Sequence, residues 1–113
     1  MSKLLNNITA DPIQRHTILF EESEIVLDLR FYPRQNFWAG SVEYKEKAVK
    51  GFKLTVEVLH LLNTVFPFDF VVLDNSGNGI DPFLIDDFSN LRCSIYLLEP
   101  SDIEIIRGME VSL

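Results

Sequence analysis

The alternation of apolar and polar residues predicts strands in the first half of the chain. Every second position of residues 24–32 is apolar, at Ile25, Leu27, Leu29 and Phe31. Successive side chains of a strand point to opposite faces, so this spacing is typical of an antiparallel strand with one buried face. A β-prone run precedes it at residues 14–21, and a third strand is expected over residues 37–44, with Trp38, Val42 and Tyr44 on one side. Polar turn residues separate the three segments, which predicts a meander.

The second half of the chain contains shorter segments. Residues 48–52 form an extended piece, and residues 54–58 alternate like a strand. A helical spacing competes with that alternation, because apolar residues stand at i, i+3, i+4 and i+7, namely Val58, Leu61, Leu62 and Val65. We favour a short helix over residues 56–64, with Thr55 as its N-cap. Strands are expected at residues 68–73 and 91–98, where β-branched and aromatic residues gather.

These elements predict one domain of mainly β structure, a small antiparallel β-sandwich or barrel with one or two short helices. The second helix is expected at the C-terminus, where Ser101 and Glu104 have the spacing of a capping box. The 113 residues are divided into an N-terminal arm (1–12), a β-rich domain (13–100) and a C-terminal extension (101–113). No internal repeat or flexible linker divides the chain further.

Charge and composition narrow the classes of partner. Ten Lys and Arg against seventeen Asp and Glu give a net charge of −7, which repels nucleic-acid phosphates and anionic lipid headgroups. The longest apolar stretch, residues 56–73, is interrupted by polar residues and Pro67, so no membrane span is expected. The first twelve residues are too polar after Leu5 for a secretory signal. We therefore expect a protein made in the cytoplasm that does not bind nucleic acid directly.

The sharpest local motif is the run Asp74-Asn75-Ser76-Gly77-Asn78-Gly79. It matches the first half of a calcium-binding loop, with oxygen ligands at positions 1, 3 and 5 and glycine at position 6. Position 12 is Ile85, where a bidentate Glu is needed to complete the oxygen shell. We interpret the run as a glycine-dependent turn that binds no calcium.

Other chemistry-bearing residues have simpler interpretations. Asp81, Asp86 and Asp87 are the densest carboxylate group, and a helix start or a solvated loop explains them better than a catalytic cleft. His16 and His60 lack partners at metal-ligand spacing. Cys93 lies in an alternating run and is expected to be a small buried hydrophobe. The sequence therefore predicts no catalytic, cofactor-binding or metal-binding residues.

Several segments, in a fixed order, carry a resemblance to a known family. They are Asp11-Pro12-Ile13-Gln14, residues 27–32, Trp38, residues 51–54, the Leu61-Leu62 pair, residues 74–82, Asp86-Asp87-Phe88 and Ile95-Tyr96-Leu97. Together they resemble the phage baseplate plug family, small proteins encoded with the tail genes of contractile-tailed phages. The likeness covers about residues 11–100. The chain departs from the family at residues 45–48, where the family often has a turn of the Asp-Gly type.

The resemblance implies a non-enzymatic virion protein at the distal end of a contractile phage tail. A plug of this family would sit in the baseplate among hub, spike, tube or tube-initiator subunits, in several copies that follow three-fold or six-fold symmetry. Apolar residues near both ends are expected to dock on such neighbours, and these are Leu4, Leu5, Ile103, Ile105, Ile106, Met109 and Val111. An assembly chaperone or adaptor that leaves the finished particle is the alternative, and a small metal-dependent or thiol enzyme is a third class.

Overall fold

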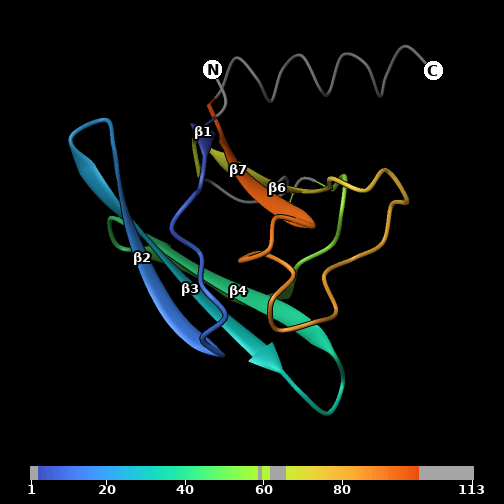
Figure 1. Ribbon diagram of the computed structural model, residues 1–113. Helices are drawn as coiled ribbons and strands as arrows, with labels where there is room; N and C mark the ends of the chain where they lie inside the picture. The colour runs from blue at the N-terminus through green and yellow to red at the C-terminus, as the bar shows by residue number, and fades with distance from the viewer. Residues whose placement is uncertain (1–2, 59, 62–65, 100–113) are drawn as a thin grey trace.

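The structure is a computed structural model, and it describes residues 3–58, 60–61 and 66–99. It has seven strands, β1 (Lys3–Leu4), β2 (Ile13–Phe20), β3 (Ser23–Tyr32), β4 (Phe37–Tyr44), β5 (Lys47–Lys53), β6 (Asp69–Asp74) and β7 (Cys93–Leu98). They form a four-stranded sheet in the order β2-β3-β4-β5 and a three-stranded sheet in the order β1-β7-β6. All strand pairs are antiparallel, and the two sheets face each other (Figure 1). The predicted antiparallel β fold is confirmed.

The four-stranded sheet is a meander joined by tight turns. The β2–β3 hairpin closes at the pair Phe20 and Ser23, and both turn residues have positive φ, 48° at Glu21 and 66° at Glu22. Two positive φ values define the turn whose twist matches that of the flanking strands. The β4–β5 hairpin closes at Tyr44 and Lys47, so the chain makes a two-residue turn at residues 45–46.

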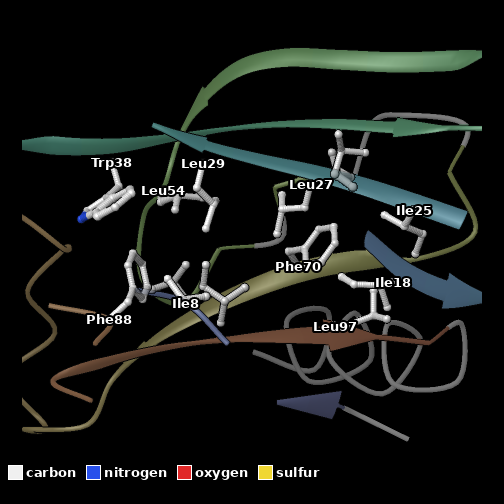
Figure 2. Close-up of a cluster of buried hydrophobic side chains, with 14 of the residues drawn as sticks. Ile8, Ile18, Ile25, Leu27, Leu29, Trp38, Leu54, Phe70, Phe88 and Leu97 are labelled. Carbon is white, nitrogen blue, oxygen red and sulfur yellow. The ribbon is translucent and has the colours of Figure 1, made fainter. Parts of the chain in front are cut away.

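The inner faces of the two sheets enclose the core. The alternating residues predicted to be buried on β3 are all buried, as are Trp38, Val42 and Tyr44 on β4. Side chains from both sheets and from the loops meet between the layers (Figure 2). Fully burying one aliphatic or aromatic side chain contributes about 1.5–3 kcal/mol, so this layer is the main source of stability. The placement of Trp38 in the core is confirmed.

The N-terminal segment is part of the core, although the sequence suggested a peripheral arm. β1 pairs with β7, with Lys3 opposite Leu97, and the amide of Leu5 donates a hydrogen bond to the carbonyl of Ile95 at 2.9 Å. Ile8 is buried in the hydrophobic cluster between the sheets (Figure 2). A single buried side chain without periodic neighbours leaves no pattern in the sequence, which explains the difference.

The helix expected over residues 56–64 is absent from the described residues of that segment. Val56 forms a parallel bridge with Val72, and Glu57 has a φ of 60°, which an α-helix does not allow. The amide of Glu57 donates to the carbonyl of Val72 at 2.9 Å, so pairing with β6 takes the place of helical hydrogen bonds. Residues 59 and 62–64 of that segment, and the whole helix expected from residue 101, lie outside the described residues.

No membrane-spanning helix is found within the described ranges. The strands are six to ten residues long, apart from the two-residue β1, and every predicted strand has a counterpart in the structure.

Candidate interaction surface

The loop between β6 and β7, residues 75–92, is the most distinctive part of the fold. Loops of this length without regular structure are uncommon, and they are usually functional or disordered. Figure 1 shows the loop leaving β6, running down beside β4 and returning to β7. Its contacts fix it in one arrangement.

Arg92 is the centre of those contacts. Its Nε and Nη2 atoms donate to Oδ1 and Oδ2 of Asp87, each at 2.8 Å. Nη1 donates to the carbonyl of Ile80 at 3.1 Å, and Nη2 also donates to the carbonyl of Asp81 at 3.0 Å. The Asp74 carboxylate lies 3.3 Å from Nη1. One guanidinium therefore ties together the start, the middle and the end of the loop, and the planar fork of arginine suits such bidentate pairing.

Asp87 is the buried partner of this ion pair. Burial by itself would raise the pKa of the carboxyl, but hydrogen bonds from Arg92 and from backbone amides together outweigh burial, and the pKa is lowered. Those amides belong to Phe83 and Leu84, which donate to Oδ2 at 2.7 and 2.8 Å. The sequence suggested a solvated loop or a helix start for Asp86 and Asp87, and this is wrong for Asp87. Asp86 is exposed, whereas Asp87 is fully buried, because only Asp87 faces the guanidinium.

The run from Asp74 to Gly79 forms the predicted turn. Oδ1 of Asp74 accepts from the amide and the hydroxyl of Ser76, at 2.9 and 2.6 Å, and Oδ2 accepts from the amide of Ile80 at 2.9 Å. Gly77 and Gly79 have positive φ of 81° and 66°, where a side chain would be strained. The hydrogen bonds lower the pKa of Asp74 to about 2. The carboxylate thus organises the turn that opens the loop.

The remaining acidic candidate, Asp81, holds the loop to the neighbouring segment. Its Oδ1 accepts from the amide of Val56 at 2.9 Å, and Oδ2 lies 3.9 Å from Nζ of Lys53. Asp81 and Asp87 therefore serve different partners and form no shared acid site. Within the described ranges, no group of three or more His, Cys, Asp and Glu is arranged to hold a metal ion.

The two histidines and the cysteine are packed into the fold. His60 Nε2 accepts from the amide of Thr55 at 3.0 Å, so its Nδ1 carries the proton and donates to the carbonyl of Phe70 at 2.8 Å. His16 lies 2.7 Å from the Gln14 side chain, and partial burial lowers its pKa. Cys93 is fully buried, as predicted, and burial raises the pKa of its thiol to about 11.

The loop carries a set of exposed apolar residues. Ten large hydrophobic residues are exposed in the described part of the chain, and five of them lie between residues 80 and 91. We call these five the loop platform: Ile80, Phe83, Leu84, Ile85 and Leu91. Their exposed fractions range from 37% to 61%. Sequence reasoning missed the platform, although the apolar run Phe83-Leu84-Ile85 in a turn-rich region was a visible signal.

Trp38 connects the loop platform to the core. Its Nε1 donates to the carbonyl of Leu84 at 3.0 Å, and the ring of Phe88 packs edge-on against it with 5.5 Å between centroids. Figure 2 shows Trp38 and Phe88 at one end of the buried cluster. The guanidinium of Arg92 lies over the Phe83 ring, 5.2 Å from its centroid. The platform is therefore held from beneath by a strand residue and from the side by Arg92.

Comparison of the chain with protein-family models and with curated proteins found no match.

Proposed function

We propose that the protein is a structural component of a contractile phage tail baseplate. It would act as a plug-like protein of the virion at the tail tip and contact hub, spike, tube or tube-initiator subunits. The observation that carries the proposal is the loop platform, a set of exposed apolar residues on a loop that hydrogen bonds from Arg92 and Trp38 hold. The kind of assembly, a contractile tail baseplate, is inferred from the order of sequence segments that resembles the plug family.

The loop platform has the physical properties of a protein-binding surface. Large exposed apolar clusters on small proteins usually mark a surface that a partner covers. A loop that is already ordered loses little conformational freedom on binding, so more of the contact energy appears as affinity. The exposed carboxylate of Asp86 and the net charge of −7 favour a protein partner over nucleic acid.

A non-enzymatic role accords with how the chemistry-bearing residues are used. Asp74, Asp87 and Arg92 bind one another or nearby backbone groups of the loop. Cys93 is a buried thiol whose pKa is raised to about 11, which opposes formation of the reactive thiolate at neutral pH. Each of these groups already has a structural task in the fold.

The test is the protein's copy number in purified phage particles. A structural subunit is retained at a fixed number per tail, in a multiple set by three-fold or six-fold symmetry. Phe83→Ser and Leu84→Ser should lower that number and leave tails incomplete. Leu73→Ser is the matched control, because Leu73 has a similar exposed fraction of 37% on β6 and lies outside the loop platform.

The alternative is an assembly chaperone or adaptor. Such a protein would also need an apolar binding surface, but it would be present during tail assembly and missing from mature particles. Normal particles that lack the protein would therefore replace the structural proposal with this one. Complete tails with wild-type amounts of both loop-platform variants would show that the platform is not the docking surface.

A further inference from the structure

β2 is an open edge of the four-stranded sheet. Its hairpin with β3 closes at Phe20 and Ser23, and the amide of Phe31 donates to the carbonyl of Pro12 at 2.8 Å. These two pairs show that the even-numbered residues of β2 direct their backbone groups toward β3. The odd-numbered residues therefore direct theirs outward, and within the described ranges β3 is the only strand that pairs with β2.

The same odd-numbered residues point their side chains to the outer face of the sheet. Ile13 and Leu19, one at each end of the strand, are each 72% exposed, the highest values among the exposed large hydrophobic residues. Between them, Arg15 is neutralised by Asp28, with its Nε 2.7 Å from Oδ1 and its Nη2 3.2 Å from Oδ2. The β2 edge thus offers unpaired backbone groups and two exposed apolar side chains. The one cation among its odd-numbered residues, Arg15, is already paired with Asp28.

The opposite edge of the sheet is protected in a way that β2 is not. β5 carries Lys47, Lys50 and Lys53, Gly51 has a φ of 72°, and the register with β4 shifts between Gly40 and Val42. Lysines and bulges on an edge strand prevent pairing with another chain. The contrast between the two edges indicates that β2 is left open for a partner.

We propose that β2 pairs antiparallel with β2 of a second copy of this chain, about a two-fold axis at His16. In this register Ile13 lies opposite Leu19 of the second copy, and Arg15 lies opposite its Thr17. Outward-facing residues meet outward-facing residues, as an antiparallel ladder requires. An axis at Arg15 or Thr17 would also preserve this match, but it would leave an exposed apolar residue at each end without an apolar partner.

The pairing joins the two four-stranded sheets into one continuous sheet of eight strands. Each apolar cross-strand pair adds a contact on the outer face, and the two-fold axis makes both contacts identical. A single strand edge buries less surface than a standard interface, which is typical of weak and reversible association. The residues involved are separate from the loop platform, so this inference does not depend on the proposed function.

The experiment is sedimentation equilibrium of the full chain from micromolar to millimolar concentration. The wild type is expected to dimerise, and Ile13→Lys and Leu19→Lys should each weaken the dimer by about 10-fold or more, because each places two charges in apolar contacts. Ile85→Lys on the loop platform is the control and should leave dimerisation unchanged. Circular dichroism of each variant verifies that it is folded.

A charge-swap mixture tests the register. Ile13→Lys mixed with Leu19→Glu should form a heterodimer more tightly than either variant forms a homodimer, because the introduced lysine of one chain faces the introduced glutamate of the other. A wild-type chain that stays monomeric throughout would overturn the proposal. A dimer that is insensitive to the β2 variants but lost in Ile85→Lys would also overturn it, because the loop platform would then be the interface. A chain that dimerises only after residues 100–113 are removed would overturn it as well, since that segment would then be the occupant of the β2 edge.

Discussion

Arg92 and Asp87 form a bidentate ion pair, with both Nε–Oδ1 and Nη2–Oδ2 at 2.8 Å, inside the loop that joins β6 to β7. Asp87 is fully buried, so its charge depends on this partner. Removing one member of a buried pair leaves the other charge without compensation, which costs about 3–5 kcal/mol.

Arg92→Ala should therefore lower the free energy of unfolding by about 3–5 kcal/mol, measured by urea denaturation followed by circular dichroism. Arg92→Lys should recover only part of this loss, because an ammonium group cannot donate the two parallel hydrogen bonds to Asp87. A change below about 1 kcal/mol in Arg92→Ala would show that the ion pair does not hold the loop.

Acid should destabilise the fold through Asp74 and Asp87. Both carboxyls have a pKa below the ordinary value in the folded state, about 2 for Asp74, so their ionised forms stabilise the fold. This stabilisation is complete above the unfolded pKa of about 4 and is lost as pH falls through the folded pKa. The unfolding free energy should fall between about pH 4 and pH 2, and Asp74→Asn should flatten the curve in that window.

Asp69 provides an internal contrast for this titration. Burial raises its pKa, while amide hydrogen bonds from Leu61 and Phe70 oppose the effect. The contribution of Asp69 to the unfolding free energy therefore depends on pH in the opposite direction. It is fully present below the unfolded pKa and is lost as pH rises through the raised pKa of the folded state.

An Asp74→Asn variant whose unfolding free energy falls with acid as steeply as that of the wild type would contradict the role assigned to Asp74.

Trp38→Ala should cost about 3–5 kcal/mol of unfolding free energy, because a fully buried indole leaves a large cavity. Trp38→Phe keeps an aromatic ring but removes the hydrogen bond to the Leu84 carbonyl, so it should cost less, about 1–2 kcal/mol. Hydrogen exchange of the loop amides should increase in Trp38→Phe more than exchange in β3. An equal increase in hydrogen exchange in the loop and in β3 would show that Trp38 does not order the loop.

Calcium should not bind the turn from Asp74 to Gly79. The oxygens of Asp74 already accept hydrogen bonds from Ser76 and Ile80, and the Arg92 guanidinium lies 3.3 Å away. Titration calorimetry should detect no site tighter than about 1 mM, the weak end of known loops. Heat that saturates at lower calcium concentration and disappears in Asp74→Asn would refute this.

Cys93 should react slowly with a thiol reagent such as Ellman's reagent in the native protein. It is fully buried, and its pKa is raised to about 11, so the thiolate is scarce at pH 8. Reaction should become complete once the chain is unfolded in urea. Rapid labelling of the native protein would reopen the possibility of a thiol enzyme.

The strands were predictable because their residues repeat a local pattern. Alternation at Ile25, Leu27 and Leu29 fixes both the element and its buried face, and the structure agrees. Ile8 and Val56 were not predictable in this way, because their positions depend on contacts with segments far along the chain. A helical spacing near Val58 competes with strand alternation over the same few residues, and pairing with β6 decided the outcome.

The loop was predictable only in part. Gly77 and Gly79 marked the turn correctly, since a positive φ has a sequence signature. Nothing local distinguishes Asp86 from Asp87, yet one is exposed and the other buried. That difference arises from Arg92, and a pairing through a folded loop leaves no periodic signal in the sequence.

The hydrogen bond from Trp38 to Leu84 gives the protein a built-in optical probe. The chain has one tryptophan, and its indole spans the distance from the hydrophobic core to the underside of the exposed loop. Indole fluorescence responds to changes in polarity and hydrogen bonding at the ring, so any ligand that covers or shifts the loop platform should alter the emission. Candidate baseplate proteins can thus be screened for binding to the unlabelled protein, with the emission of a single residue reporting on the surface where docking is proposed.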